Sequence, residues 1–383
     1  MVRSKSSVKQ QKKSVLSKTI DFFVHSQYHA YLVGGYVRDT TLGIEPLDID
    51  IVVEDDAIKV ARQLNTKLKG KLTVHNEFGT ASINTKQTRV DLASARVERY
   101  PSPAKLPHVY PSTINEDLNR RDFRMNAIAM SISNKNFGEI FDPFEGLDDI
   151  KKGMIRVLHK GSFTDDPTRI FRALRYKNRF GFKIGKKTKS LMTEAIDKKM
   201  IQLLSSQRIL DELKIIFEEE QYFLTIKDIS DLTSMKIRKK DLELLPVLGD
   251  NRIYYYLSKV KSIKFPLSNT ERSLVKDFQN LNNTLMRIDK ASKKSTIFSI
   301  LSPISDGVID VIPAVLPRLK QKVRIFRQLK KIKRFINGND LKKSGFKPER
   351  KFKSMLRKLR DWQFDKKIKN RKEALKYIRN TKK

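Results

Sequence analysis

Short apolar runs, separated by residues typical of tight turns, follow one another through residues 30–95. Such runs are typical of β-strands, and here they predict strands at 30–33, 49–53, 71–76, 80–84 and 89–95. Two helices are expected between them, at 36–42 and 56–68. Short strands joined by tight turns favour a mostly antiparallel sheet with helices on one face.

Beyond about residue 162 the pattern becomes helical and strand signals are few. Apolar residues at spacings of three and four predict an amphipathic helix over 319–336 with a basic opposite face. The same spacing recurs over 352–362. The chain is therefore predicted to be α+β, with a small mixed, mostly antiparallel sheet followed by all-helical domains.

Charge separates the two ends of the chain. Its 383 residues contain 80 Lys and Arg against 43 Asp and Glu, a formal charge of +37. Residues 318–383 alone hold 27 basic and 5 acidic residues. A polyanionic partner explains this excess, nucleic acid before an acidic membrane, although a Lys-rich proteome would also raise the charge. No apolar run approaches the roughly 18 residues of a membrane span, so we expect a soluble protein without membrane contact.

The chain has no cysteine, which excludes disulfides, Cys-ligated zinc and thiol chemistry. Its five histidines form no metal-binding cluster. Both features suit the reducing cytosol, and we expect a cytoplasmic protein. Residues 1–14 are basic, rich in Ser and free of acids, which fits an organellar targeting segment or a disordered tail. The lack of an amphipathic stripe favours the tail.

Two carboxylates lie two residues apart in the segment LDIDIVV, residues 47–53. Side chains alternate along a strand, so Asp48 and Asp50 project from one face while Ile49 and Ile51 face the core. Like charges held this close repel each other unless a divalent cation lies between them. Paired oxygen ligands on a strand suit Mg²⁺ bound to triphosphate oxygens, although such a pair is often only a solvated strand edge.

Neighbouring residues extend this pattern. Gly34-Gly35 permits close approach of the backbone to a phosphate, and Arg38 can contact phosphate oxygens. Asp91 adds a third carboxylate, either as a solubility charge of an edge strand or as a base or further metal ligand. Each signal is weak alone, and their close spacing favours a nucleotide site.

A series of motifs gives the chain a family resemblance. In order they are LVGGYVRD (32–39), LDIDIVV (47–53), DLNRRDFRMNA (117–127), FDPFEG (141–146), DDPTRIFRALR (165–175), FGF (180–182) and SQRI (206–209), with GNDL (338–341) and GFKP (345–348) near the end. They resemble class II tRNA nucleotidyltransferases and bacterial poly(A) polymerases, members of the DNA-polymerase-beta-like superfamily. The resemblance is nearly continuous over 30–215.

The resemblance implies an order of domains. A basic tail (1–20) would precede a polymerase-beta-like nucleotidyltransferase head (21–150), a helical neck (151–220), a helical body (221–317) and a basic helical tail (318–383). The head would perform catalysis, and the helical domains would hold the acceptor arm of a tRNA.

The family's site residues can be carried over motif by motif. The resemblance implies that Asp48 and Asp50 bind two Mg²⁺ ions and that Asp91 is the third catalytic carboxylate. Gly35 and Arg38 would contact the triphosphate of CTP or ATP.

Further nucleotide contacts would come from two later motifs. Arg121 and Asp122 would handle phosphate and ribose. Asp166 and Arg169 would read the Watson–Crick edge of the incoming base, with Arg172 and Arg175 as additional contacts. One departure is Asp165, where the family commonly has Glu.

The base-reading motif also has a physical rationale. On a helix, Asp166, Arg169 and Arg172 would share one face, and a carboxylate beside an Arg fork can pair with a planar base edge. A surface salt bridge between Asp166 and Arg169 is the alternative interpretation.

These motifs predict an enzyme that adds the 3′-terminal CCA to tRNA and releases pyrophosphate. An enzyme that adds only A or only CC, a poly(A) polymerase and a catalytically dead RNA-binding relative are the alternatives. The Gly-Arg-Arg/Lys-Phe segment of poly(A) polymerases is missing at 79–84. Four prolines over 101–111 predict an extended connection rather than an element at 98–115, and the family has a flexible loop there whose length argues against CC addition alone.

Overall fold

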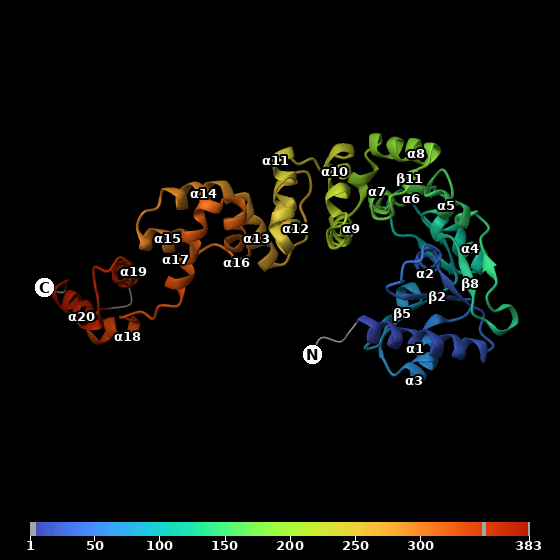
Figure 1. The fold of residues 1–383 in the computed structure, drawn as a ribbon, viewed down its shortest axis with the longest axis horizontal. Coiled ribbons are helices and arrows are strands. Elements are labelled where there is room, and N and C mark those ends of the chain that lie inside the picture. Colours follow the sequence, from blue (N-terminus) through green and yellow to red (C-terminus); the bar gives the residue numbers. More distant parts are fainter. Residues whose placement is uncertain (1–4, 347–349, 382–383) are drawn as a thin grey trace. The chain divides into compact units, whose positions relative to one another are not determined.

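The computed structural model describes residues 5–346 and 350–381 of the chain. It divides into two compact units, 1–233 and 234–383, drawn in Figure 1. All strands of the described residues lie in the first unit, and the second is helical. The predicted α+β class is confirmed. The finer division into neck, body and tail stays a prediction. Met1–Ser4 and, in the GFKP motif, Lys347 and Pro348 lie outside the described residues.

The first unit begins with a sheet-forming region. Its elements are α1 (Lys5–Val24), β1 (Ala30–Val33), α2 (Gly35–Thr41), β2 (Ile49–Val53), α3 (Ala57–Leu68), β3 (Lys71–His75), β4 (Thr80–Asn84), β5 (Arg89–Ser94), β6 (Arg96–Arg99), β7 (His108–Pro111), α4 (Ile114–Asn119), β8 (Ala129–Ser131) and β9 (Ile140–Phe141). A helical region follows, with α5 (Gly146–Lys152), β10 (Met154–Ile155), α6 (Ser162–Asp165), α7 (Thr168–Phe180), β11 (Lys183–Ile184), α8 (Lys186–Asp197), α9 (Ser206–Glu218) and α10 (Tyr222–Leu232).

The main sheet has seven strands in the order β3-β4-β5-β2-β1-β8-β9. All its pairs are antiparallel except β2 with β5, which is parallel. The sheet is thus mixed and mostly antiparallel, as predicted. In the parallel pair, Asp50 lies directly beside Asp91.

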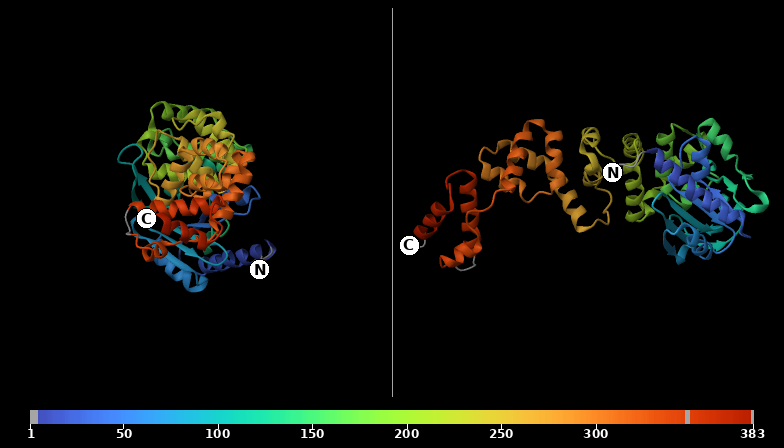
Figure 2. Two further views of the ribbon diagram at one scale, coloured as in Figure 1. Left: turned by 90° about the vertical axis from the view of Figure 1, so that its left-hand side faces the viewer. Right: turned by 60° about the horizontal axis from the view of Figure 1, so that its bottom comes forward.

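Both faces of the sheet are covered, although by different helices. Helix α3 contacts β4 and β5, and α1 packs against α3 (Figures 1 and 2). Ile49, Ile51 and Leu92 of this face are at most 1% exposed, which confirms that the two Ile side chains face a core.

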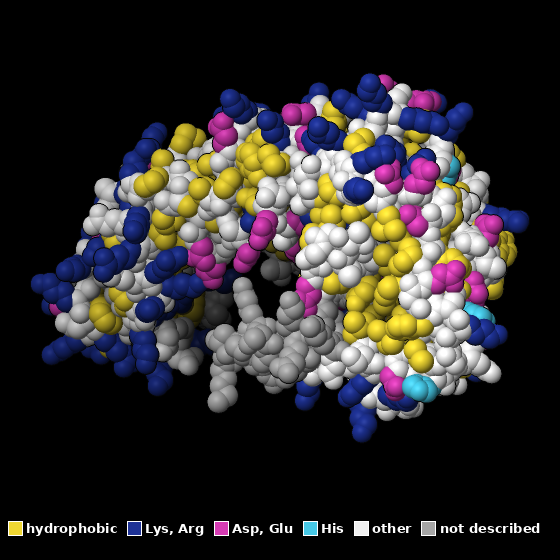
Figure 3. Space-filling model, turned by 45° about the vertical axis from the view of Figure 1, so that its right-hand side comes forward, with side chains coloured by type: hydrophobic (Ala, Val, Ile, Leu, Met, Phe, Trp, Pro, Cys, Tyr) yellow, Lys and Arg dark blue, Asp and Glu magenta, His cyan; other side chains and the backbone are white. Residues whose placement is uncertain are grey.

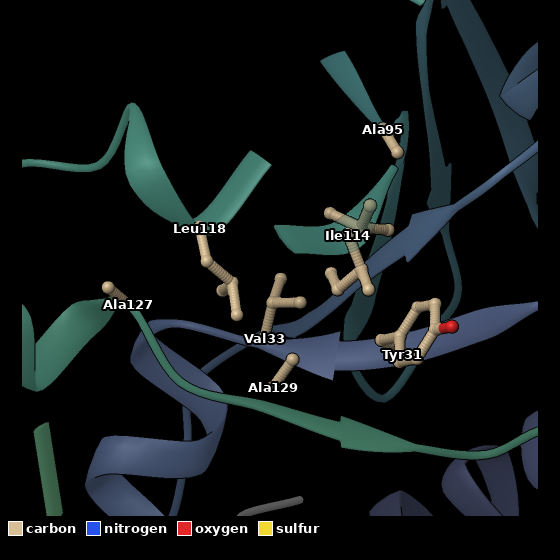
Figure 4. Packing of buried hydrophobic residues seen from close by; sticks show 8 residues of the cluster. Tyr31, Val33, Ala95, Ile114, Leu118, Ala127 and Ala129 are labelled. Atoms are coloured by element: carbon tan, nitrogen blue, oxygen red, sulfur yellow. The ribbon is translucent and has the colours of Figure 1, made fainter. Parts of the chain in front are cut away.

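On the other face, α4 packs on the half of the sheet formed by β1, β2 and β8. Its Ile114 and Leu118 join Tyr31, Val33 and Ala129 in one buried cluster, shown in Figure 4. The expectation of helices on one face is therefore wrong. The half that carries Asp91 stays partly open on this side, because Asp91 keeps 23% of its side chain exposed.

Two segments differ from their predictions. Residues 5–24 form α1, where a disordered tail was expected for 1–20. Val15, Thr19 and Phe23 are buried, so packing of the second half of the helix explains its order.

The Pro-rich stretch also contains an element, because β7 pairs with β6 in a two-stranded sheet. A two-stranded sheet has an outer edge on each strand, where the missing N–H of a proline costs no hydrogen bond. Between the two strands, the backbone N–H of Ala104 donates to the carbonyl oxygens of Thr164 and Asp165. This segment is thus attached to the helical region.

The second unit consists of helices. They are α11 (Lys239–Leu242), α12 (Arg252–Lys259), α13 (Asn269–Gln279), α14 (Leu281–Lys290), α15 (Lys294–Leu301), α16 (Asp306–Val315), α17 (Lys320–Lys330), α18 (Gly338–Lys343), α19 (Arg350–Phe364) and α20 (Arg371–Thr381). The helix predicted for 319–336 ends at Lys330, and the one predicted for 352–362 is α19. A separate core joins α18, α19 and α20, with Leu341, Leu359 and Ile378 at its centre.

Lys and Arg side chains are spread over the face of the molecule shown in Figure 3, and acidic side chains are sparser. Within the described residues, no single helix is both long and apolar enough to cross a membrane. The pair α15 and α16 reaches that length and composition together, but it bends by 120°.

Shortening the Leu118 side chain of α4 should destabilise the first unit. Leu118 is fully buried against the sheet, so we expect Leu118→Ala to lower the free energy of unfolding by about 2–5 kcal/mol through the lost contacts and the cavity left behind. Leu106→Ala, at a side chain that is 58% exposed, should change it by less than about 0.5 kcal/mol. Urea unfolding followed by circular dichroism measures both, and equal losses would contradict the packing described for α4.

Candidate functional site

Three carboxylates lie near one another where β2 and β5 run side by side. Asp48 precedes β2, and Asp50 and Asp91 are register partners on the two strands. Asp91 is held by its neighbours: its Oδ1 accepts a hydrogen bond from Ser82 Oγ at 2.5 Å, and its Oδ2 accepts one from Arg89 Nε at 2.6 Å. Asp50 and Asp91 therefore lie on one face of the sheet, whereas Asp48 lies just before the strand, so that the predicted shared strand face of Asp48 and Asp50 stays a prediction.

The electrostatics of the site centre on Asp50. Burial first, and then the charges of Asp91 and Asp48, raise the pKa of Asp50 to about 6, although the charges of Arg121 and Arg89 lower it in part. A bound cation would stabilise the negative charge of such a carboxylate, and Mg²⁺ prefers oxygen ligands of this kind.

This donor set fits a metal ion in part. Within the described residues, no group of three or more His, Asp or Glu side chains converges to hold a metal. The oxygens of Asp91 already accept hydrogen bonds from Ser82 and Arg89. Asp48 and Asp50 are thus the carboxylates available to a metal, with the remaining ligands left to oxygens of a substrate or water.

A glycine turn next to β1 brings an arginine to the carboxylates. Gly34 has φ +56°, and a Cβ there would lie 2.4 Å from Arg121 Nη1. A Cβ on Gly35 would lie 3.7 Å from Asp50 Oδ2. Glycine is thus required at position 34 both by the backbone conformation and by the close approach of Arg121.

The arginines beside this turn are fixed by buried partners. Arg38 is 4% exposed and donates from Nη1 to Asn126 Oδ1 at 2.7 Å and from Nε to Asp39 Oδ1 at 2.7 Å. Arg121 donates from Nη2 to Asp117 Oδ2 at 2.9 Å. Such bonds set the position of each guanidinium before any ligand arrives.

A cavity of about 610 Å³ opens beside these residues, within the usual range for ligand sites. Six arginines and six carboxylates line it, together with smaller and aromatic residues: Arg38, Arg120, Arg121, Arg169, Arg172, Arg208, Asp50, Glu98, Asp122, Asp166, Asp211, Glu212, Gly34, Gly35, Tyr100, Asn126, Thr168 and Tyr176. Glu212 Oε2 is buried without a hydrogen-bond partner among the described residues. The cavity therefore offers fixed donors and a free acceptor to a polar ligand.

The start of α7 differs from its prediction. Asp166 lies outside the helix in extended conformation, with φ −134° and ψ 93°, because Pro167 follows it and disfavours helical geometry at the preceding residue. Its Oδ1 accepts hydrogen bonds from Thr168 N at 3.0 Å and from Arg208 Nη2 at 2.7 Å. The predicted single helix face for Asp166, Arg169 and Arg172 is thus wrong, although all three line the cavity.

Arg169 and Arg172 are held by different partners. Arg169 donates to Ser162 Oγ at 2.7 Å and to the carbonyl oxygen of Arg120 at 2.8 Å, and no ion pair with Asp166 forms. Arg172 Nε donates to Asp122 Oδ2 at 2.8 Å. The guanidinium groups of α7 are thereby fixed in the cavity wall.

Asp122 is the buried centre of this wall. Burial alone would raise the pKa of Asp122, but the charge of Arg172 and the hydrogen bond from Asn126 lower it to about 2. A carboxylate with such a pKa stays ionised at neutral pH and stabilises the fold.

The structure gathers most of the predicted site residues in one place. Those that line the cavity are Gly35, Arg38, Asp50, Arg121, Asp122, Asp166, Arg169 and Arg172. Asp48 and Asp91 lie beside Asp50, outside the lining. Arg175 does not line the cavity, because it is buried and donates to Glu219 Oε1 at 2.9 Å.

Several lining residues had no predicted role. Arg208, Glu212 and Asn126 fall within or next to recognised motifs, but their partners are distant in sequence. Arg208 lies 42 residues from Asp166, and no local spacing signals such a contact.

The chain is similar to several known proteins. Residues 30–156 match the poly(A) polymerase head domain. The chain is 29% identical over 390 residues to the A-adding tRNA nucleotidyltransferase of Halalkalibacterium halodurans, covering 95% of this chain and 91% of that protein. It is 40% identical over 193 residues to the A-adding tRNA nucleotidyltransferase of Aquifex aeolicus, covering 50% of this chain but only 23% of that protein.

The whole fold has a solved counterpart. The Thermotoga maritima CCA-adding enzyme complexed with tRNA aligns with a TM-score of 0.69 and 28% sequence identity, over 100% of this chain and 99% of that one.

The buried carboxylate of Asp122 should produce a pH-dependent contribution to stability. Its folded pKa of about 2 lies below the ordinary value of 3.8, so the ionised form stabilises the protein above about pH 4, and this stabilisation is lost as the pH falls toward 2. We expect Asp122→Asn to lower the free energy of unfolding by about 2 kcal/mol at pH 7, with a difference from wild type that shrinks below pH 4.

Urea unfolding at a series of pH values measures this difference. Asp197→Asn, which removes an exposed carboxylate at the end of α8, is the control and should leave stability nearly unchanged. A difference between Asp122→Asn and wild type that is constant from pH 7 to pH 3 would contradict the role of the ion pair with Arg172.

Proposed function

We propose that this chain, which belongs to the family of tRNA nucleotidyltransferases and poly(A) polymerases, completes the 3′ CCA end of tRNA from CTP and ATP with release of pyrophosphate. The observation that carries the proposal is the position of Asp50. It lines a cavity walled by six arginines, and two further carboxylates lie beside it at the parallel pair of strands.

The residues around the Gly34-Gly35 turn would bind the triphosphate. Gly35 keeps the backbone close to Asp50, and Arg121 points to the same place with its guanidinium held by Asp117. Arg38 also lines the cavity, where hydrogen bonds to Asn126 and Asp39 fix its guanidinium, and it would contact the triphosphate as well. A phosphate would therefore meet donors whose positions are already fixed.

Asp48 and Asp50 would hold Mg²⁺, with Asp91 kept beside them by Ser82 and Arg89. A bound Mg²⁺ would lower the pKa of the attacking 3′-hydroxyl and would offset the charge of the leaving pyrophosphate. The chain's own contribution is to orient the α-phosphate toward the RNA and to hold the carboxylates side by side. No side chain needs to form a covalent intermediate.

The α7 wall would select the base. Cytosine and adenine share an amine donor beside a ring-nitrogen acceptor, whereas uracil and guanine invert that pattern. A carboxylate that accepts from the amine and an arginine that donates to the ring nitrogen would admit the first two bases and reject the others. Asp166 and Arg169 supply these groups, and Arg208 fixes Asp166 in place.

The basic C-terminal residues would hold the RNA. Residues 318–383 carry 27 basic and 5 acidic residues, which suits contact with the phosphates of a tRNA. This assignment rests on charge and on the coverage of both units by the tRNA-bound Thermotoga enzyme.

Addition of A alone is a second candidate, because the Aquifex and Halalkalibacterium relatives are both A-adding enzymes. The two activities differ in their substrates. A CCA-adding enzyme extends tRNA that ends at its discriminator base, whereas an A-adding enzyme needs tRNA that already ends in CC.

The deciding experiment offers each of these two tRNAs with labelled CTP or ATP. We expect CTP to extend the first tRNA and ATP to extend the second. Extension of the second tRNA alone would identify an A-adding enzyme, and extension of the first by CTP without any later A would identify a CC-adding one. If neither tRNA is extended while RNA still binds, the proposed function is wrong.

The carboxylate next to the cavity should be essential for addition. Since metal-bound charge supplies several kcal/mol to this chemistry, Asp50→Asn should slow Mg²⁺-dependent nucleotide addition at least about a hundredfold while tRNA binding persists. Asp55→Asn, at an exposed position after β2, is the matched control and should retain wild-type turnover. Labelled-nucleotide incorporation and tRNA gel-shift assays measure the two effects, and normal turnover of Asp50→Asn would exclude it as a metal ligand.

A further inference from the structure

We propose that Arg89 is the counter-ion of the three carboxylates Asp48, Asp50 and Asp91. In the metal-free protein, its guanidinium supplies part of the positive charge that a metal would supply, and it has to move away when a divalent cation binds. The inference concerns the chain's own residue and rests on the metal site of the proposed function. It predicts that the protein limits its own affinity for metal through one arginine.

Arg89 is placed among the carboxylates by the strand itself. It lies two residues before Asp91 on β5, and alternation puts both side chains on the same face of the sheet. Its Nε and Nη2 both lie 2.6 Å from Asp91 Oδ2. The same Nη2 lies 4.0 Å from Asp48 Oδ2, so one guanidinium spans the two outer carboxylates.

The position of Asp91 follows from this contact. Ser82 Oγ donates to its Oδ1, and Arg89 donates to its Oδ2, so both oxygens have protein partners. Together these bonds hold Asp91 against β4 and β5. Within the described residues, no three acidic side chains converge as a metal site requires. A metal that recruits Asp91 as its third carboxylate would bring a second positive charge next to the Arg89 guanidinium, and the repulsion between these charges favours release of the Arg89 bond.

Charge balance explains why an arginine is present at all. Three carboxylates this close together would repel each other in the metal-free protein. Arg89 and Arg121 supply the nearby positive charge that offsets this repulsion. Arg121 is bonded to Asp117 and lies in the wall of the cavity. Arg89 is outside that lining and 51% exposed, so it can turn into solvent without disturbing buried packing.

The test measures metal binding directly. In Arg89→Gln the positive charge is gone while a polar side chain remains, so we expect the protein to bind Mn²⁺ about three- to tenfold more tightly than wild type, as followed by the electron paramagnetic resonance signal of free Mn²⁺. Arg89→Lys keeps the charge and should stay within about twofold of wild type. Arg62→Gln, at an exposed position on α3, removes the same charge from the same unit and should leave the affinity unchanged.

A second measurement separates this role from ordinary structural support. Without metal, Arg89→Gln should melt at a lower temperature than wild type, and saturating Mg²⁺ should raise its melting temperature by more than it raises that of wild type. A purely structural arginine would lower the melting temperature equally with and without Mg²⁺.

The outcomes also distinguish this inference from the proposed function. Unchanged or weaker Mn²⁺ binding by Arg89→Gln, in a protein whose wild type binds Mn²⁺ and extends tRNA, overturns the inference alone. Weaker CTP binding without tighter metal binding would make Arg89 a nucleotide ligand and also overturns it. A wild type that binds no Mn²⁺ and extends no tRNA overturns both.

Discussion

The parallel pairing of β2 with β5 is the constraint on which the site depends. It is the one parallel pair of the seven-stranded sheet, and it sets Asp50 beside Asp91 at the spacing of neighbouring strands, about 4.8 Å. Packing of Ile49 and Ile51 on the opposite face fixes the register, since a slip by one residue would turn the carboxylates into the core. The burial of apolar side chains on one face thus stabilises a strand pairing that holds two repelling carboxylates close together on the other face.

Several arginines around the cavity are held by carboxylates rather than left free. Arg172 with Asp122 and Arg208 with Asp166 join segments that are separate in the sequence, and Arg121 with Asp117 joins the residues after α4 to the helix. A buried charge without a partner is costly, so each pair fixes both of its members. The wall is therefore fixed where it faces a ligand, and within the described part of the chain Glu212 Oε2 is left without a hydrogen-bond partner.

Local patterns predicted the parts of this site that a single segment determines. Alternation along β2 indicated the shared face of Asp48 and Asp50, and the Gly-Gly turn indicated a close approach. Helix periodicity failed at Asp166 because Pro167 forces it out of α7, a local rule that outweighs the motif's spacing. Contacts between distant segments, such as Arg208 with Asp166 or α4 on the second face of the sheet, left no periodic signal to detect.

The cavity and residues 318–383 differ in their balance of charge. The cavity contains equal numbers of arginines and carboxylates, so it can order a nucleotide but offers little net attraction for a polyanion. Residues 318–383, with 27 basic residues against 5 acidic ones, offer that attraction without carboxylates placed for catalysis. Contacts with phosphates weaken steeply as the salt concentration rises, whereas buried ion pairs are screened little. The affinity for RNA should therefore depend on ionic strength far more than the geometry of the cavity does. Under the proposed function, the basic residues would hold the RNA while the carboxylates and arginines of the cavity keep their places.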